Sequence, residues 1–311
     1  MEFRHIPVLL DKVIEGLDIK NNGIYVDCTM GGGGHSSVIA TNLSIEGKLI
    51  GFDRDIEAVN VCRKKFATNK NVEVIHANFK DFPSILQERG LKEKIDGILV
   101  DLGVSSYQID NGERGFSFLR EGRLDMRMDT SQEKDAYFIV NNYPKEKLIK
   151  ILYQYGEESN AKRIVENICE YRKVKPIETT SQLKNIIEMS FPKKVIYGKG
   201  GVSKKTFQAI RIEVNGELDG LDEFLRESIS MLAKGGRMAV ITFHSLEDRI
   251  VKNVFKEFAT DCICPPKTPI CICGHKAEIK LVNNKPITAG KSELEFNSRS
   301  SSAKLRVIEK I

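Results

Sequence analysis

The sequence has no hydrophobic run that approaches the roughly 20 consecutive apolar residues of a membrane-spanning helix. Residues 1–7 lack the apolar stretch of a secretory signal peptide. Internal repeats and low-complexity segments are absent as well, which argues against a repeat protein or a disordered chain. From these absences we expect a soluble globular protein of the cytoplasm that does not bind a membrane.

A strong charge of one sign is also missing, because 48 Lys and Arg side chains stand against 43 Asp and Glu side chains, for a net charge of +5. The total charge therefore says little about a partner. Basic side chains do gather in two places, which suits a polyanion, although solvated loops and tails show the same pattern. They are Lys193, Lys194, Lys199, Lys204 and Lys205 in one stretch, and Arg299, Lys304 and Arg306 in the other.

Short apolar strands alternate with helical patterns over the first hundred residues. The expected strands cover residues 24–27, 48–53, 72–75 and 95–101, and the expected helices cover residues 36–43, 56–66 and 82–91. This alternation predicts a parallel sheet that is covered by helices on both faces.

The alternation stops after Asp101 and resumes near residue 206. Helical patterns between these points cover residues 137–155, 159–172 and 180–189, after a segment rich in Gly, Ser, Arg and Asp. A chain of 311 residues is long enough for about two domains. We expect residues 105–205 to form an inserted, mostly helical substrate-recognition domain, and residues 1–104 and 206–311 to form one α/β domain.

The returning pattern begins with apolar residues on one face of a single long helix over residues 207–225, which Gly216 and Gly220 weaken slightly. The next expected helix starts near Ser245, whose spacing from Asp248 is close to that of a capping box. The other expected elements are a strand over 237–243, this helix over 245–258, and two late strands over 278–282 and 304–309, which can pair as an antiparallel edge.

Four glycines at residues 31–34 lie between a strand and a helix. Glycine lets a backbone approach a ligand closely, and a helix N-terminus offers free N–H groups. Asp53 ends the next strand, where a carboxylate can bind both hydroxyls of a ribose, so we expect an adenosine-containing cofactor. Ser36 replaces the last glycine of the dinucleotide motif, and Asp27 before the loop suits a cationic amino-acid end. These residues favour S-adenosylmethionine over NAD, with a simple tight turn as the alternative.

Asp101 ends the fourth expected strand. In amino-methylating enzymes an Asp or Asn at this place often begins a D/N-P-P-aromatic motif, whose oxygen accepts a hydrogen bond from the exocyclic amine. The two prolines and the aromatic residue are missing here, since Leu102, Gly103 and Val104 follow. The position supports Asp101 as a catalytic residue and leaves its role open.

Five sequence blocks resemble a known family. They are residues 5–10, residues 27–36, residues 96–106, residues 114–118 with 124–128, and residues 206–212 with 243–249. The blocks run nearly end to end through the chain, in the family's order. On these blocks the chain resembles the bacterial methyltransferases of family H, which act on cytosine N4 of small-subunit ribosomal RNA. It departs from their pattern at Ser298 and Ser301, which replace a Pro and an Arg and would remove a phosphate contact if this segment binds RNA.

The resemblance implies a class I S-adenosylmethionine-dependent methyltransferase fold, which is a Rossmann-like α/β sheet with an inserted helical domain. It also implies methyl transfer from S-adenosylmethionine to a cytosine N4 in the decoding region of 16S rRNA, with the 30S subunit as the partner. Carried over by position, the cofactor-binding set is Gly33, Gly34, His35, Asp53, Phe79, Asp101 and Gln108. A homodimer, free rRNA as the substrate and the order of binding stay open.

Three further residues are candidates for substrate binding. His244 ends the fifth expected strand, where it can contact the target base or a phosphate, although a single His is more often a structural hydrogen-bonding group. Arg249 and Arg211 can bind phosphate, or they can pair with Glu on their own helices. Phe116 and Phe118 can stack on RNA bases, but we favour a role in anchoring the insertion to its core.

Four cysteines, Cys262, Cys264, Cys271 and Cys273, form two C-x-C pairs in a proline-containing segment. Four thiolates so close together can hold a tetrahedral Zn²⁺, and disulfides are not expected in a reducing cytoplasm. Since C-x-C is less usual than C-x-x-C in zinc sites, free thiols are an equal alternative to structural zinc. A catalytic metal is not expected, because methyl transfer from a sulfonium needs none.

Two other functions stay open. A DNA amino-methyltransferase would use the same chemistry, but the missing D/N-P-P-aromatic motif counts against it. A non-catalytic RNA-binding assembly factor that retains a cofactor fold is the second alternative, and the intact Asp53 and Asp101 count against it.

Overall fold

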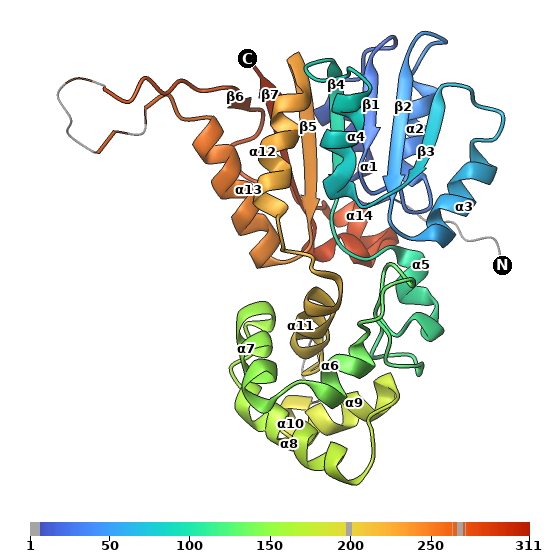
Figure 1. Cartoon of the computed structure of the whole chain (residues 1–311), viewed down its shortest axis with the longest axis vertical. Coiled ribbons are helices and arrows are strands. Elements are labelled where there is room, and N and C mark those ends of the chain that lie inside the picture. The colour runs from blue at the N-terminus through green and yellow to red at the C-terminus, as the bar shows by residue number, and fades with distance from the viewer. Residues whose placement is uncertain (1–6, 197–200, 263, 266–269, 271) are drawn as a thin grey trace. The chain divides into compact units, whose positions relative to one another are not determined.

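The computed structural model describes residues 7–196, 201–262, 264–265, 270 and 272–311. The chain forms two compact units (Figure 1), the first from residues 1–103 and 220–311 and the second from residues 104–219. Residues 5 and 6, Lys199 and Cys271, which the sequence singled out, lie outside the described residues. Among the residues that are described, no helix is both long enough and apolar enough to cross a membrane.

The first unit is built on a seven-stranded sheet with the order β3-β2-β1-β4-β5-β7-β6. Its strands are β1 (Ile24–Asp27), β2 (Lys48–Asp53), β3 (Val72–His76), β4 (Ile95–Asp101), β5 (Leu232–Thr242), β6 (Ile279–Leu281) and β7 (Lys304–Lys310). The strands from β3 to β5 in this order pair in parallel, whereas β7 runs antiparallel to both β5 and β6. The expected parallel sheet and its antiparallel edge are confirmed.

Helices cover both faces of this sheet. On one face, Val13 of α1 and Ile39 of α2 join a buried cluster with side chains of β2, β4, β5 and β7. On the other, Phe82 of α4 packs edge-on against Phe224 of α12, with ring centroids 5.6 Å apart; α4, α12 and α13 lie in front of the sheet in Figure 1. The helices of this unit are α1 (Leu10–Leu17), α2 (Gly34–Thr41), α3 (Ile56–Lys65), α4 (Phe82–Glu88), α12 (Leu221–Met231), α13 (Ser245–Phe258) and α14 (Lys291–Phe296).

The single helix expected over residues 207–225 is wrong. The chain forms α11 (Lys204–Asn215) and then α12, because Gly216 and Gly220 both adopt left-handed φ angles, of 56° and 65°. Gly216 is the C-cap of α11, a place that favours a residue without a Cβ. The apolar face of α11 packs into the core of the second unit, so residues 206–219 lie in that unit and not with the α/β sheet.

The second unit is helical and has an apolar core of its own. Its helices are α5 (Ser106–Asp110), α6 (Ala136–Asn142), α7 (Lys145–Gly156), α8 (Ala161–Val174), α9 (Thr180–Glu188), α10 (Lys193–Ile196) and α11. The helical stretch expected over residues 137–155 is divided in two, since Pro144 cannot donate a backbone hydrogen bond and stands at the N-cap of α7. Phe116 and Phe118 pack against the core, as the anchoring role predicts.

Candidate cofactor site and cysteine cluster

The glycine loop joins β1 to α2 in a conformation that most side chains do not permit. Gly31 and Gly33 have φ angles of 51° and 69°. A Cβ at Gly33 would lie 3.0 Å from Phe66 and 3.2 Å from Cys62. Lys65 of α3 donates a hydrogen bond to the carbonyl oxygen of Gly33 at 2.9 Å. The loop is therefore held against α3, and its shape depends on the small size of Gly33.

Asp27, at the end of β1, is a buried acid that the same loop orients. Ser36 Oγ donates to Asp27 Oδ2 at 2.5 Å, and the N–H of Thr29 donates to Oδ1 at 3.1 Å. Burial raises the pKa of Asp27 to about 6, and the negative charge of Asp53 acts in the same direction. Ser36, which replaces the last glycine of the dinucleotide motif, thus orients the carboxylate of Asp27 by a hydrogen bond.

Asp53 connects the end of β2 to the glycine loop. Its Oδ2 accepts a hydrogen bond from the N–H of Gly31 at 2.7 Å, and its Oδ1 accepts one from the N–H of Asp55 at 2.8 Å. Burial raises the pKa of Asp53. A carboxylate oxygen has two lone pairs, so each oxygen can still accept from a hydroxyl group. Asp53 can therefore shape the loop and bind a ribose at the same time.

Phe79 lies just beyond the end of β3, in the short turn Phe79–Asp81. Its ring packs edge-on against Phe224, with centroids 4.8 Å apart, and remains partly exposed. The backbone of Asp53 is close by, because His76, three residues earlier, pairs with Asp53 between β2 and β3. The aromatic ring is thus fixed near the sheet edge that carries the ribose-binding candidate.

Asp101, at the end of β4, faces His35 of α2. Asp101 Oδ2 lies 3.7 Å from His35 Nδ1, and His35 Nε2 lies 2.9 Å from the carbonyl oxygen of Val8. Burial raises the pKa of Asp101 well above its ordinary value, and the negative charges of Asp27 and Glu247 add to this effect. Asp101 Oδ1 is buried and has no hydrogen-bond partner among the described residues. It is an acceptor available to a ligand.

Asp27, Asp53 and Asp101 come together because β2, β1 and β4 are neighbours that run in the same direction. Ligands of parallel α/β sheets bind at this carboxyl edge of the strands. Asp27 and Asp53, whose pKa values are raised by burial, suit a ligand of positive charge, which would favour their ionised forms. The edge therefore has the donor and acceptor set for a nucleoside that carries a cationic group.

His244 begins α13 as its N-cap. The N–H of Glu247 donates to His244 Nδ1 at 3.4 Å, Glu247 Oε2 accepts from the N–H of Phe243 at 2.9 Å, and His244 Nε2 lies 3.0 Å from Glu247 Oε1. The near capping box expected at Ser245 and Asp248 is wrong, since the reciprocal pair is His244 and Glu247. These contacts agree with the structural alternative for His244. Sequence reasoning missed Glu247, although H-x-x-E has the spacing of a capping box.

The other candidates have partners within their own units. Arg211 donates to both carboxylate oxygens of Glu217, at 2.9 and 2.8 Å, in the second unit. Gln108 closes a capping box at the start of α5, where its Oε1 accepts from the N–H of Ser105 at 3.0 Å. Arg249 is exposed on α13. Binding of phosphate by Arg211 would have to compete with its ion pair to Glu217.

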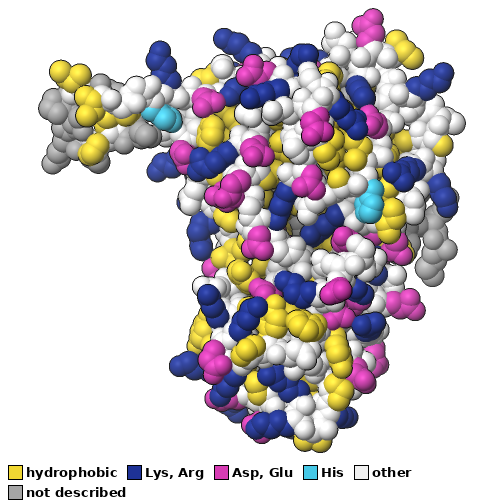
Figure 2. Space-filling view, viewed as in Figure 1, with side chains coloured by type: hydrophobic (Ala, Val, Ile, Leu, Met, Phe, Trp, Pro, Cys, Tyr) yellow, Lys and Arg dark blue, Asp and Glu magenta, His cyan; other side chains and the backbone are white. Residues whose placement is uncertain are grey.

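Basic side chains do not form a surface of one sign on the face shown in Figure 2, where Lys and Arg are interspersed with Asp and Glu. Lys304 and Arg306 both pair with Asp248, at 3.1 and 2.7 Å. Burial alone would raise the pKa of Asp248, but these two partners bring it below its ordinary value. A pocket of the first unit is lined by Lys252, Lys256, Lys285 and Arg306, among other residues. This pocket is a basic concave surface of the first unit.

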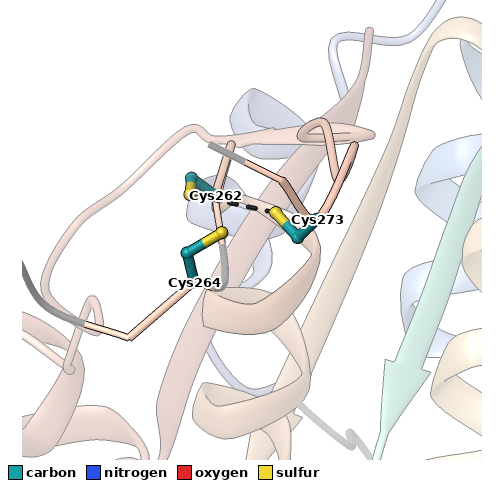
Figure 3. Close-up of side chains that lie close together, drawn as sticks. All are labelled: Cys262, Cys264 and Cys273. Carbon is teal, nitrogen blue, oxygen red and sulfur yellow. Dashed lines mark hydrogen bonds between the residues drawn. The ribbon is translucent and has the colours of Figure 1, made fainter. Parts of the chain in front are cut away.

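Three of the four candidate metal ligands lie together after α13. The Sγ atoms of Cys262, Cys264 and Cys273 all lie within 4.8 Å of one another, and Figure 3 shows them turned toward a common point. Cys262 Sγ and Cys273 Sγ are 3.8 Å apart. The three described cysteines of the C-x-C pattern thus form a group that can hold a metal ion.

Comparison with known proteins gives matches over the whole chain. A model described as the MraW methylase family matches residues 2–311. Relatives named ribosomal RNA small subunit methyltransferase H, from Clostridium botulinum and Finegoldia magna, are each 51% identical over 311 and 313 residues and are covered over 100% of both chains. A SAM-dependent O-methyltransferase structure from Thermotoga maritima is 9% identical, with a TM-score of 0.42 over 100% of this chain and 68% of that chain.

These findings confirm the resemblance that five sequence blocks indicated. They also confirm the fold class of S-adenosylmethionine-dependent methyltransferases, since the mixed seven-stranded sheet carries an inserted helical unit. By its match over residues 2–311 and its identity of about one half to full-length relatives, the chain belongs to the MraW methylase family.

Proposed function

We propose that the protein transfers a methyl group from S-adenosylmethionine to the N4 amine of a cytidine in the decoding region of 16S rRNA. The observation that carries this proposal is the position of Asp101, whose buried Oδ1 has no partner among the described residues, at the end of the strand beside the glycine loop. Membership of the MraW methylase family, and relatives named for the small-subunit ribosomal RNA, support the substrate class.

The residues at the sheet edge fit the cofactor. The glycine loop and the start of α2, at Gly33, Gly34 and His35, would contact the cofactor through their backbone. Asp53 would bind the ribose hydroxyls, and Phe79 would flank the adenine. Bound S-adenosylmethionine would supply a methyl group that the positive sulfur already activates. For Gln108 we propose a cofactor contact that adds to its capping box.

Asp101 would act on the target amine. The lone pair of cytosine N4 is delocalised into the ring, so the amine is a weak nucleophile. A hydrogen bond from N4–H to Asp101 Oδ1 would localise that lone pair and orient it toward the methyl group. The backbone of Asp101 is itself fixed, since its N–H donates to Thr29 Oγ1 at 2.7 Å.

For RNA binding we propose the inserted helical domain as the part that presents the base, which must be single-stranded or extruded from a helix. His244, Arg211 and Arg249 are proposed substrate contacts, and the accessible Arg249 is the strongest of the three. The basic pocket beside α13 would add contacts to the phosphate backbone. We propose the 30S subunit as the partner, a cytoplasmic location because that subunit is there, and a homodimer as an open form of the enzyme.

The test uses 30S subunits from a strain that lacks this methylation, labelled S-adenosylmethionine, and mass spectrometry of the digested RNA. We expect N4-methylcytidine with the wild-type protein and none with Asp101→Ala. Naked rRNA and duplex DNA serve as parallel substrates. Label in DNA alone would move the function to a DNA amino-methyltransferase. No methylated cytidine from any of the three would overturn the enzyme and favour an assembly factor.

A further inference from the structure

We propose that the segment between α13 and β6 binds one structural Zn²⁺ through the thiolates of Cys262, Cys264 and Cys273, with Cys271 as the fourth ligand. The first three lie together in the structure. Cys271 is assigned from the repeated C-x-C pattern, because it lies outside the described residues. The proposed methyl transfer does not use this site.

The distance between two of the sulfur atoms agrees with a metal site and not with a disulfide. A disulfide places its sulfurs about 2.05 Å apart. Four ligands at about 2.3 Å from a tetrahedral zinc are about 3.8 Å apart. Cys262 Sγ and Cys273 Sγ are 3.8 Å apart, and the three described sulfurs all lie within 4.8 Å of one another. A small inward movement of Cys264 would complete three corners of a tetrahedron.

The segment has little apolar packing with which to hold this shape. Ile270 is 76% exposed and Ile272 is 85% exposed. Cys262 and Cys273 are exposed as well, although Cys is usually among the most buried residues. In Figure 1 the described part of the segment extends away from the sheet. Short irregular segments without a core commonly need a metal or a disulfide to become ordered.

Hydrogen bonds close the base of the segment and leave the sulfurs beyond it. The N–H of Glu278 donates to the carbonyl oxygen of Phe258 at 2.9 Å, and the N–H of Ala277 donates to Asp261 Oδ1 at 3.3 Å. These bonds bring Cys262 and Cys264 close to Cys273. A metal ion would then crosslink the residues that follow α13 to the residues that precede β6.

The chemistry of the ligands selects the metal. Thiolates are soft ligands that favour zinc or iron over Mg²⁺ and Ca²⁺. Four-thiolate sites with no open position are structural, and a tetrahedral site is the usual zinc geometry. His275 follows Cys273 by two residues, but its ring nitrogens are not in the group of ligand atoms within 4.8 Å of one another. We therefore assign four sulfur ligands and no histidine.

The experiment measures metal in the full-length protein, purified without a polyhistidine tag from zinc-supplemented medium. We expect mass spectrometry of the metal content to give about one zinc per chain and no stoichiometric iron. Replacement by cobalt should give the intense thiolate-to-cobalt charge-transfer band of a tetrahedral site. X-ray absorption of the zinc protein should show four sulfur neighbours at about 2.3 Å.

Cys262→Ser, Cys264→Ser, Cys271→Ser and Cys273→Ser should each lose most of the zinc, with the circular dichroism of the rest of the fold unchanged. Cys169→Ser is the matched control, because Cys169 packs beside the core of the second unit, and it should keep the metal. Wild-type protein that stays free of zinc after exchange would overturn the site. A spectrum with nitrogen or oxygen neighbours only, or zinc retained by Cys271→Ser, would overturn the four-thiolate assignment.

Discussion

His35 Nδ1 lies 3.7 Å from Asp101 Oδ2, while the other ring nitrogen, Nε2, lies 2.9 Å from the carbonyl oxygen of Val8. A carbonyl oxygen only accepts hydrogen bonds, so Nε2 carries a proton, and in the neutral ring Nδ1 does not. Burial raises the pKa of Asp101 well above its ordinary value. If Asp101 is neutral, a proton on Oδ2 would lie toward His35 Nδ1, and Oδ1 would be left as an acceptor.

This arrangement predicts different outcomes for two substitutions of Asp101. Asp101→Asn keeps an acceptor oxygen in the position of Oδ1 and an N–H toward His35, so its kcat should fall by no more than about tenfold. Asp101→Ala removes the acceptor, and its kcat should fall by at least about a hundredfold. If Asp101→Asn is as inactive as Asp101→Ala in single-turnover methylation, Asp101 acts as a charged base and not as a neutral acceptor.

We expect the carboxyl group of Asp27 to release a proton when the cofactor binds. Its pKa is raised to about 6 in the free protein, chiefly by burial, and a cationic ligand beside it would lower that value. Affinity for S-adenosylmethionine should therefore rise with pH below about 6, by up to about tenfold per pH unit, and level off above it. Calorimetry at pH 6 in two buffers of different ionisation enthalpy measures the released proton. Asp27→Asn should release fewer protons, and equal release from both proteins would contradict the assignment.

Substitution of Asp53 should weaken cofactor binding whether or not the cofactor carries its methyl group. Hydrogen bonds to a charged acceptor contribute about 1.5–3 kcal/mol, so Asp53→Asn should weaken binding by about 10- to 150-fold. S-adenosylhomocysteine has the same ribose and should lose as much affinity as S-adenosylmethionine. Asp81→Asn is the control, because Asp81 is exposed and makes no side-chain cap to α4. An unchanged dissociation constant for Asp53→Asn would separate this acid from ribose binding.

Substitution of Gly216 by Ala should lower the stability of the protein, whereas in a continuous helix the same substitution would raise it. The φ of 56° at Gly216 is left-handed, so Gly216→Ala should lower the free energy of unfolding by about 1–2 kcal/mol. In the interior of a helix the same change would raise stability by about 1 kcal/mol. Urea unfolding measures the difference. Gly32→Ala, at an exposed position where a Cβ meets nothing within 4 Å, should stay within about 0.5 kcal/mol of the wild type. A stabilised Gly216→Ala would refute the strained C-cap.

The strands and the acids at their ends could be predicted because a buried parallel strand is a short apolar run that ends where polarity begins. The break between α11 and α12 could not, because the apolar residues on its two sides keep one helical phase. Phe207 and Ile210 pack into the core of the second unit, whereas Phe224 packs on Phe82 in the first. The spacing of apolar residues shows that one face of a helix is buried, but it does not show in which core that face lies.

The roles of His244 and Arg211 show a second limit. Both are polar residues near expected strand or helix ends, and both can be interpreted as ligands of RNA. The structure pairs His244 with Glu247 and Arg211 with Glu217. The first pair depends on where α13 begins and the second on the turn at Gly216, so neither follows from composition or from the spacing of apolar residues. Asp53, by contrast, could be predicted from the sequence because it lies at the end of a recognisable strand.

The position of β7 between β5 and β6 has a consequence for synthesis of the chain. β6 comes first along the chain, yet among the described strands it pairs with β7 alone. Residues 104–219 have by then left the ribosome as one continuous helical unit. The helical unit can therefore fold while the sheet still waits for residues 304–310 to cover the edge of β5. Until they arrive, β5 is an exposed edge open to pairing with another chain, so a stalled or shortened product would aggregate through its sheet with its helical half already folded.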